Sequence, residues 1–219
     1  MVKLGPLPDA AQIVQAAVSG SHNDTGWVNV HHLQYVGTAP GVADLQAVGT
    51  AIGNAWNTNI APMCHANVVM KAVVLTDLTN RSAAQGSVSG LNHAGTRAGV
   101  DVSNNVAAVV SWAINHRYRG GHARTYFPAG ATADYTNGRI WTGAFTLALN
   151  TAATAYRTAI NAITVSGTTY KMVMVQFYRT NPTTKLIEYV IPPVPYTIQG
   201  NQVHGRVDTQ RRRLGKETP

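Results

Sequence analysis

The stretch 65–78 reads HANVVMKAVVLTDL and decides the fold class. Apolar side chains occupy both sets of alternating positions, with Val68 and Met70 in one set and Val69 and Val73 in the other. A strand that is apolar on both faces is covered by other elements on both sides. We therefore expect a mainly β protein with several layers.

Three other runs predict strands because they combine β-branched and aromatic residues over a suitable length. They are WVNVHHLQYV at 27–36, NVAAVVSWAINH at 105–116 and YKMVMVQFYR at 170–179. Near the C-terminus, the prolines of IPPVPYTI at 191–198 indicate an edge or extended segment, and QVHGRVD at 202–208 indicates a short strand.

Two segments instead show apolar residues at intervals of three and four, which is the pattern of a helix with one buried face. The first is predicted over about 42–57, and its internal glycines mean that it depends on a neighbour for stability. The second is predicted over about 140–163, where the pattern lasts for more than six turns. The apolar positions are Leu45, Val48, Ile52 and Trp56 in the first segment, and Trp141, Phe145, Leu149, Ala152, Tyr156, Ile160 and Ile163 in the second.

The elements do not alternate strictly between strand and helix, so an antiparallel β-sandwich of jelly-roll type with two helical insertions fits better than a doubly wound sheet. We expect a single domain of this kind over residues 25–210. Residues 1–24, with a short helical pattern from Ala10 to Val18, are predicted to form an N-terminal arm or leading segment. Residues 211–219 are predicted to form a basic C-terminal tail.

The composition indicates a protein that buries much of its surface against partners. Only 12% of the 219 residues are charged, against about 25% in an average soluble protein. Small residues with low desolvation cost supply the polar surface instead, which favours assembly with identical subunits over a freely soluble enzyme. The formal net charge of +8 at pH 7 indicates an anionic partner such as a nucleic acid.

A first basic motif, HRYRGGHARTYFP, spans residues 116–128. Its guanidinium groups could pair with phosphates while the interleaved aromatic rings stack on bases. The alternative is an arginine-rich turn that bonds to carbonyls or carboxylates of a neighbouring subunit. The candidate residues are Arg117, Arg119 and Arg124.

A second basic motif, RVDTQRRRLGK, spans residues 206–216. Together the two motifs hold eight of the 17 basic residues, which favours a charged face. The alternative is a solvated tail or an edge that contacts a partner chain. The candidate residues are Arg206, Arg211, Arg212, Arg213 and Lys216.

Other functional classes find little support in the sequence. Neighbouring residues on a strand face opposite ways, so His31 and His32 do not share a metal ion, and no metal-binding spacing of His and Cys occurs. The nine acids are scattered, no nucleotide-binding or hydrolase motif is present, and Cys64 is expected to be a buried, inert thiol. We expect no enzyme, no metal and no cofactor.

Membrane insertion and secretion are also not expected. No run of about 18 apolar residues is present that could cross a bilayer, and the N-terminus lacks the pattern of a signal peptide. We therefore expect the chain to stay inside the cell that makes it.

The two motifs RYRGGHARTYFP and RVDTQRRRLG, framed by strands rich in Ala, Val, Thr and Asn, resemble those of small coat proteins of icosahedral RNA or single-stranded DNA viruses, of the single jelly-roll kind. The resemblance implies an eight-stranded sandwich repeated in a closed shell, with basic residues facing the genome. The chain departs from many such proteins because residues 1–24 contain only one basic residue, Lys3.

The sequence thus leads to a capsid protein that assembles in the host cell interior into a virion, with identical subunits and viral RNA or single-stranded DNA as its partners. The alternative is a cellular nucleic-acid-binding module that uses the same arginines.

Overall fold

The computed structural model describes residues 12–78, 84–101, 107–113, 122–136, 140–172 and 174–180, and the short segments 187–189, 194–195, 197–198 and 202–203. Side chains are described for residues 12–78, 84–101, 129–134, 142–145, 147–149 and 151–171.

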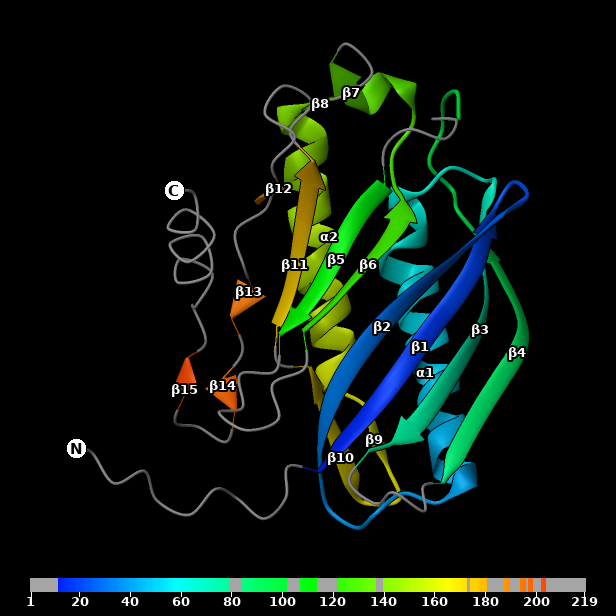
Figure 1. The fold of residues 1–219 in the computed structure, drawn as a ribbon, viewed down its shortest axis with the longest axis vertical. Coiled ribbons are helices and arrows are strands. Elements are labelled where there is room, and N and C mark those ends of the chain that lie inside the picture. The colour runs from blue at the N-terminus through cyan, green and yellow to red at the C-terminus, as the bar shows by residue number, and fades with distance from the viewer. Residues whose placement is uncertain are drawn as a thin grey trace, which may run out of the picture.

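The main feature is a six-stranded antiparallel sheet with the strand order β4-β3-β1-β2-β10-β9 (Figure 1). Strands β1 and β2 form a hairpin whose two-residue turn places Asn23 in the left-handed region, with φ at 51°, as tight hairpins require. The strands are β1 (Ile13–His22), β2 (Thr25–Val36), β3 (Val68–Asp77), β4 (Gln85–Ala94), β9 (Thr164–Val165) and β10 (Thr168–Met172).

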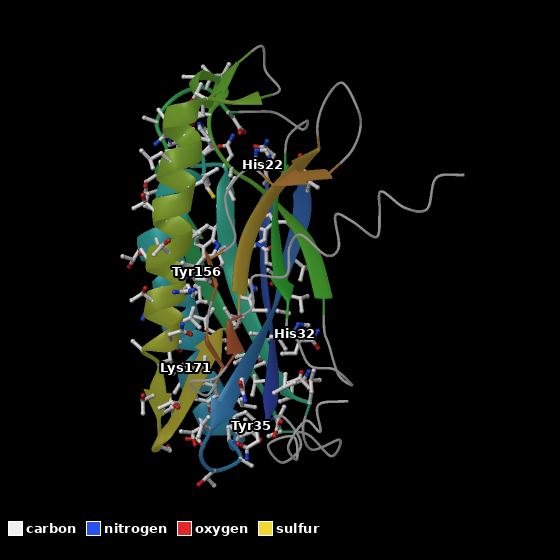
Figure 2. The ribbon with its side chains drawn as sticks, turned by 90° about the vertical axis from the view of Figure 1, so that its left-hand side faces the viewer. His22, His32, Tyr35, Tyr156 and Lys171 are labelled. Atoms are coloured by element: carbon white, nitrogen blue, oxygen red, sulfur yellow. The ribbon has the colours of Figure 1, made fainter. Side chains whose placement is uncertain are left out.

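Two long helices, α1 (Val42–Asn59) and α2 (Gly143–Asn161), cover one face of this sheet, and Figure 2 shows them on the same side of the strands. The backbone of α1 lies close to the sheet at Gly49, where a Cβ atom would come within 2.9 Å of Leu75 Cδ1. Helix α2 begins after Thr142, whose hydroxyl accepts a hydrogen bond from the Phe145 amide at 3.2 Å. Both predicted helices are therefore confirmed, although Ile140–Trp141, at the start of the second predicted range, form a short strand.

A second sheet has the order β12-β11-β5-β6, and β13 pairs with β11 beside it. The predicted strand 170–179 passes from one sheet to the other, because its first part is β10 and its second part is β11. Two pairs of short strands, β7-β8 and β14-β15, and two short 3-10 helices, η1 (Ala61–Met63) and η2 (Thr132–Asp134), complete the described part. The strands are β5 (Ala107–Ala113), β6 (His122–Pro128), β7 (Tyr135–Thr136), β8 (Ile140–Trp141), β11 (Met174–Thr180), β12 (Ile187–Tyr189), β13 (Val194–Pro195), β14 (Thr197–Ile198) and β15 (Gln202–Val203).

The described core lies between the six-stranded sheet and the two helices. Trp27 of β2 stacks on Trp56 of α1 with ring centroids 5.8 Å apart, which joins the two layers. The mainly β class with two helices is confirmed, whereas a jelly-roll sandwich is not, because helices supply the layer against the buried face of this sheet.

Part of the N-terminal arm prediction was wrong. Residues Ile13–His22 form strand β1, which pairs with β2 on one side and β3 on the other. Val14 and Val18 are four residues apart, which suits a helix, but with Ala16 they also alternate along a strand, and all three are buried. Pairing with two neighbouring strands decided between these readings.

Candidate assembly surfaces

The outward face of α1 carries very little charge. Asp44 is the only ionisable residue among the 18 of this helix, and its carboxylate accepts hydrogen bonds from the Ser166 hydroxyl at 2.6 Å and the Gly41 amide at 3.0 Å. The hydrogen bond from the Ser166 hydroxyl has the larger effect, and together with the one from the Gly41 amide it lowers the pKa of Asp44. The exposed residues of the helix are uncharged and mostly small: Val42, Ala43, Gln46, Ala47, Thr50, Asn54, Asn57 and Thr58.

The outward face of α2 has the same character. Arg157 is its only charged residue among 19 and is half-buried, whereas Leu147 is 66% exposed. Its fully exposed residues with described side chains are Gly143, Ala144, Leu147, Thr151, Thr154, Ala155 and Thr158.

Three threonine hydroxyls on these faces are bonded within their own helices. Thr151 donates to the Leu147 carbonyl at 3.1 Å and Thr158 to the Thr154 carbonyl at 2.9 Å, and on α1 Thr50 bonds to the Gln46 carbonyl at 3.1 Å. Moving a hydroxyl from water into an interface costs less free energy when the hydroxyl already donates a hydrogen bond to a protein acceptor. Interface cores are depleted of charged residues in the same way, so these two helix faces suit burial against another protein surface.

A polar junction at the far end of the β1-β2 hairpin centres on Asp101. Its carboxylate contacts His22 Nε2 at 2.8 Å and accepts amide hydrogen bonds from Asn67 at 2.6 Å and Asn23 at 3.2 Å. Partial burial alone would raise the pKa of Asp101, but the hydrogen bonds from these three side chains together lower it. The junction fastens the hairpin end to the loop that follows η1.

The Asp101 junction has chemistry that a catalytic or metal site would also use, because His65 Nδ1 lies 3.8 Å from the carboxylate. Within the described part of the chain, however, no three His, Cys, Asp or Glu side chains are arranged to hold a metal ion. The nearby Cys64 thiol is fully buried, and burial raises its pKa, which disfavours the thiolate form. The hydrogen bonds of Asp101 crosslink the hairpin end to Asn67.

A second crosslink joins Arg97 to Asp134. The guanidinium binds both carboxylate oxygens, at 3.0 Å and 2.5 Å, and stacks over the Phe145 ring with 5.0 Å between guanidinium carbon and ring centroid. The hydrogen bonds that Arg97 donates to Asp134 raise the pKa of Arg97. Asp134 also accepts the Ala131 amide at 2.7 Å, so this pair fixes the segment that leads into α2.

Most of the basic residues belong to segments whose side chains are not described. The part with described side chains holds four of the 17 basic residues, namely Lys71, Arg97, Arg157 and Lys171, against five of the nine acids, namely Asp24, Asp44, Asp77, Asp101 and Asp134. The other segments therefore carry 13 basic residues and four acids.

Among the arginines singled out from the sequence, Arg124 lies on β6 opposite Ser111 of β5. Arg117 and Arg119 fall between β5 and β6, outside the described residues, and so do Arg206, Arg211, Arg212, Arg213 and Lys216. The helix faces were not predicted from the sequence, although the ranges 42–59 and 143–161 each contain a single charged residue.

Neither helix in the described part of the chain is long and apolar enough to cross a membrane. Comparison with family models, with curated proteins and with solved structures gives no match.

Proposed function

We propose that this protein is a structural capsid protein whose copies assemble into a closed icosahedral shell around a viral RNA or single-stranded DNA genome. The observation that carries the proposal is the scarcity of charge on the outward faces of α1 and α2, since each helix has a single charged residue and that residue is half-buried. A helix that stays in water normally carries a charged outer face, whereas the center of a protein interface is depleted of charge. Burial between identical subunits accounts for both faces at once.

The distribution of basic residues supports the second half of the proposal. The part whose side chains are described holds four basic residues and five acids, and the 13 remaining basic residues lie in other segments, including both arginine motifs. A shell that encloses a polyanion needs neutral surfaces where subunits meet and positive charge where the genome lies. This chain has both kinds of segment.

The test is to express the full chain, remove nucleic acid with nuclease, and examine the protein by size-exclusion chromatography and electron microscopy. Closed particles of uniform diameter are the expected result. A protein that elutes near 23.3 kDa at every concentration and salt condition would overturn the proposal.

The same basic segments favour a second candidate, a cellular nucleic-acid-binding module. It predicts a monomer or dimer that binds single-stranded RNA or DNA with strong salt dependence. Substituting Arg211, Arg212 and Arg213 by Ala distinguishes the two. In a capsid protein the particles still form but package less nucleic acid, whereas in a binding module the variant loses its only measurable activity.

A further inference from the structure

Strand β4 is an open edge of the six-stranded sheet. It pairs with β3 on one side, from Gln85 opposite Thr76 to Ala94 opposite Val69, and no strand in the described part of the chain pairs with its other side. The amide and carbonyl groups on that other side are free to bond to a further strand. Figure 1 shows β4 at the outer edge of the sheet, beside α1.

The first half of this edge lacks the charged residues and prolines that commonly prevent strands from joining. Soluble proteins protect edge strands with charged residues, especially Lys, with Pro, or by keeping them short. Strand β4 has 10 residues, QGSVSGLNHA, with no Pro, Lys, Arg, Asp or Glu. Its exposed positions in the first half are Gln85, Ser87 and Ser89, which present no charge to an incoming strand.

Helix α1 holds the first half of the strand in place. Gly86 is buried against the helix, where a Cβ atom would come within 2.5 Å of Leu45 Cβ. Two residues further on, Val88 Cγ2 lies 3.1 Å from the position of a Cβ at Gly49. The edge is thus fixed in extended form before any partner arrives, which lowers the entropic cost of pairing.

A bulge ends the regular part of the edge at Ser89. The register with β3 shifts between Ala72, which opposes Ser89, and Met70, which opposes His93. Within this interval Gly90 and Asn92 have φ values of 73° and 48°, so the chain leaves the extended conformation. Only Gln85–Ser89 offers a straight run to a partner strand.

The geometry points to antiparallel pairing of β4 with β4 of a second copy, about a two-fold axis at Ser87, so that two six-stranded sheets become one continuous sheet. The inference deepens the proposed function, because the assembly proposed there brings copies together at high local concentration. It names the strand by which two of them join.

Three properties of the strand select a second copy and this register. An axis at Ser87 uses all five straight residues, with Gln85 opposite Ser89 of the second copy and Gly86 opposite its Val88. Residues on the helix-covered face then meet residues of the same face, as continuous sheets require. The half-exposed Val88 side chain lies opposite a glycine, which leaves room for it, and no like charges meet.

A register-specific crosslink tests the inference. In the proposed pairing Ser87 faces Ser87 of the second copy, whereas two Ser89 residues lie four positions apart along the strands, or about 13 Å. The variants Ser87→Cys and Ser89→Cys are each exposed to oxidised glutathione, which supplies the oxidising equivalents for a disulfide, and are analysed by non-reducing electrophoresis. The parent protein, which contains the fully buried Cys64 and neither new cysteine, gives the background level of crosslinking.

The expected result is a covalent dimer for Ser87→Cys, formed at least tenfold faster than for Ser89→Cys. Equal rates, or no dimer for either variant, would overturn the pairing. Electron microscopy of the same samples separates this outcome from that of the proposed function. Particles without a Ser87→Cys crosslink would refute the pairing alone, and a crosslinked dimer that never forms particles would refute the shell alone.

A charge swap provides a second readout. The pair Gln85→Lys with Ser89→Lys brings like charges together across the axis and is expected to raise the dissociation constant of the dimer at least tenfold. The matched pair Gln85→Glu with Ser89→Lys brings opposite charges together and is expected to preserve the dimer. If both double variants behave alike, the register is wrong.

Discussion

His31 of β2 and Tyr156 of α2 form a hydrogen bond inside the core, with 3.1 Å between His31 Nε2 and the Tyr156 hydroxyl oxygen. Both residues are only 2% exposed, and their rings meet edge to face with centroids 5.9 Å apart. Figure 2 marks Tyr156 in the layer between helix and sheet. Burial lowers the pKa of His31 to about 3 and raises that of Tyr156, so both side chains stay neutral where sheet and helix meet.

Acid should destabilise the subunit through His31. The unfolded chain binds a proton on this histidine below its ordinary pKa of 6.5, whereas the folded chain binds it only near a pKa of 3. The free energy of unfolding therefore falls as the pH drops through this window, by about 2 kcal/mol between pH 7 and pH 5. Denaturant titrations at both pH values and one protein concentration measure the change.

The variant His31→Gln has no proton to gain at this position and should lose that part of the pH dependence, although it is less stable at pH 7. An unchanged difference between pH 7 and pH 5 in this variant would show that other groups cause the acid sensitivity.

The substitution Gly20→Ala should disrupt the sheet at the bulge between β1 and β3. A Cβ atom at Gly20 would lie 2.1 Å from the Val69 carbonyl oxygen and 2.4 Å from the Trp27 ring. Because a backbone oxygen does not yield easily, we expect a loss of about 3 kcal/mol in the free energy of unfolding. The control Gly143→Ala, at the exposed start of α2 with no atom within 4 Å of the new Cβ, should be neutral or slightly stabilising. Equal stability of the two variants would contradict the close approach of β1 and β3.

Removing the guanidinium in Arg97→Met should weaken the segment before α2. The Asp134 carboxylate, 6% exposed, would keep the Ala131 amide but lose its charged partner. We expect the free energy of unfolding to fall by about 2 kcal/mol. Hydrogen exchange of residues 129–134 gives a local measurement, and the double variant Arg97→Met with Asp134→Asn should recover part of the loss. Without any recovery, the ion pair is not the cause.

A charge on the outward face of α2 should block assembly without unfolding the subunit. Leu147→Glu places a carboxylate on a surface that we propose to be buried in particles, and burying an unpaired charge is costly. We expect particles to be lost while circular dichroism stays that of the parent protein. The control Leu147→Gln introduces a side chain of the same shape as Glu but without the charge, so it should form more particles than Leu147→Glu. If both variants form particles as readily as the parent, this face lies outside the subunit contacts.

Local patterns predicted several elements because their physical cause is itself local. The spacing of Leu45, Val48 and Ile52 places one apolar stripe along a helix, and these residues are buried on α1. The β-branched and aromatic residues of 27–36 likewise predicted β2. Strand β4 was not predicted, because QGSVSGLNHA is rich in residues with low strand propensity, and its extended form depends on β3 and α1.

For the candidate surfaces too, one part could be predicted from the sequence and another part required the structure. The scarcity of charge could be read from the sequence, and it already indicated burial against partners. The roles of the basic motifs at 116–128 and 206–216 remain predictions. Among their candidate residues, only Arg124 on β6 has a described backbone position. That the uncharged residues form two continuous outward faces required the packing of the helices on the sheet.

The amino-acid sequence by itself determined the mainly β class, the two helices and the low charge, because side-chain periodicity and composition act over a few residues. The tertiary structure alone decided that helices cover the sheet, that Ile13–His22 is an inner strand and that β4 is an open edge. These features depend on hydrogen bonds and contacts between residues that are distant in the chain. A strand can pair with any other strand that bonds its backbone amides and buries its apolar side chains, so its own sequence does not specify its neighbour.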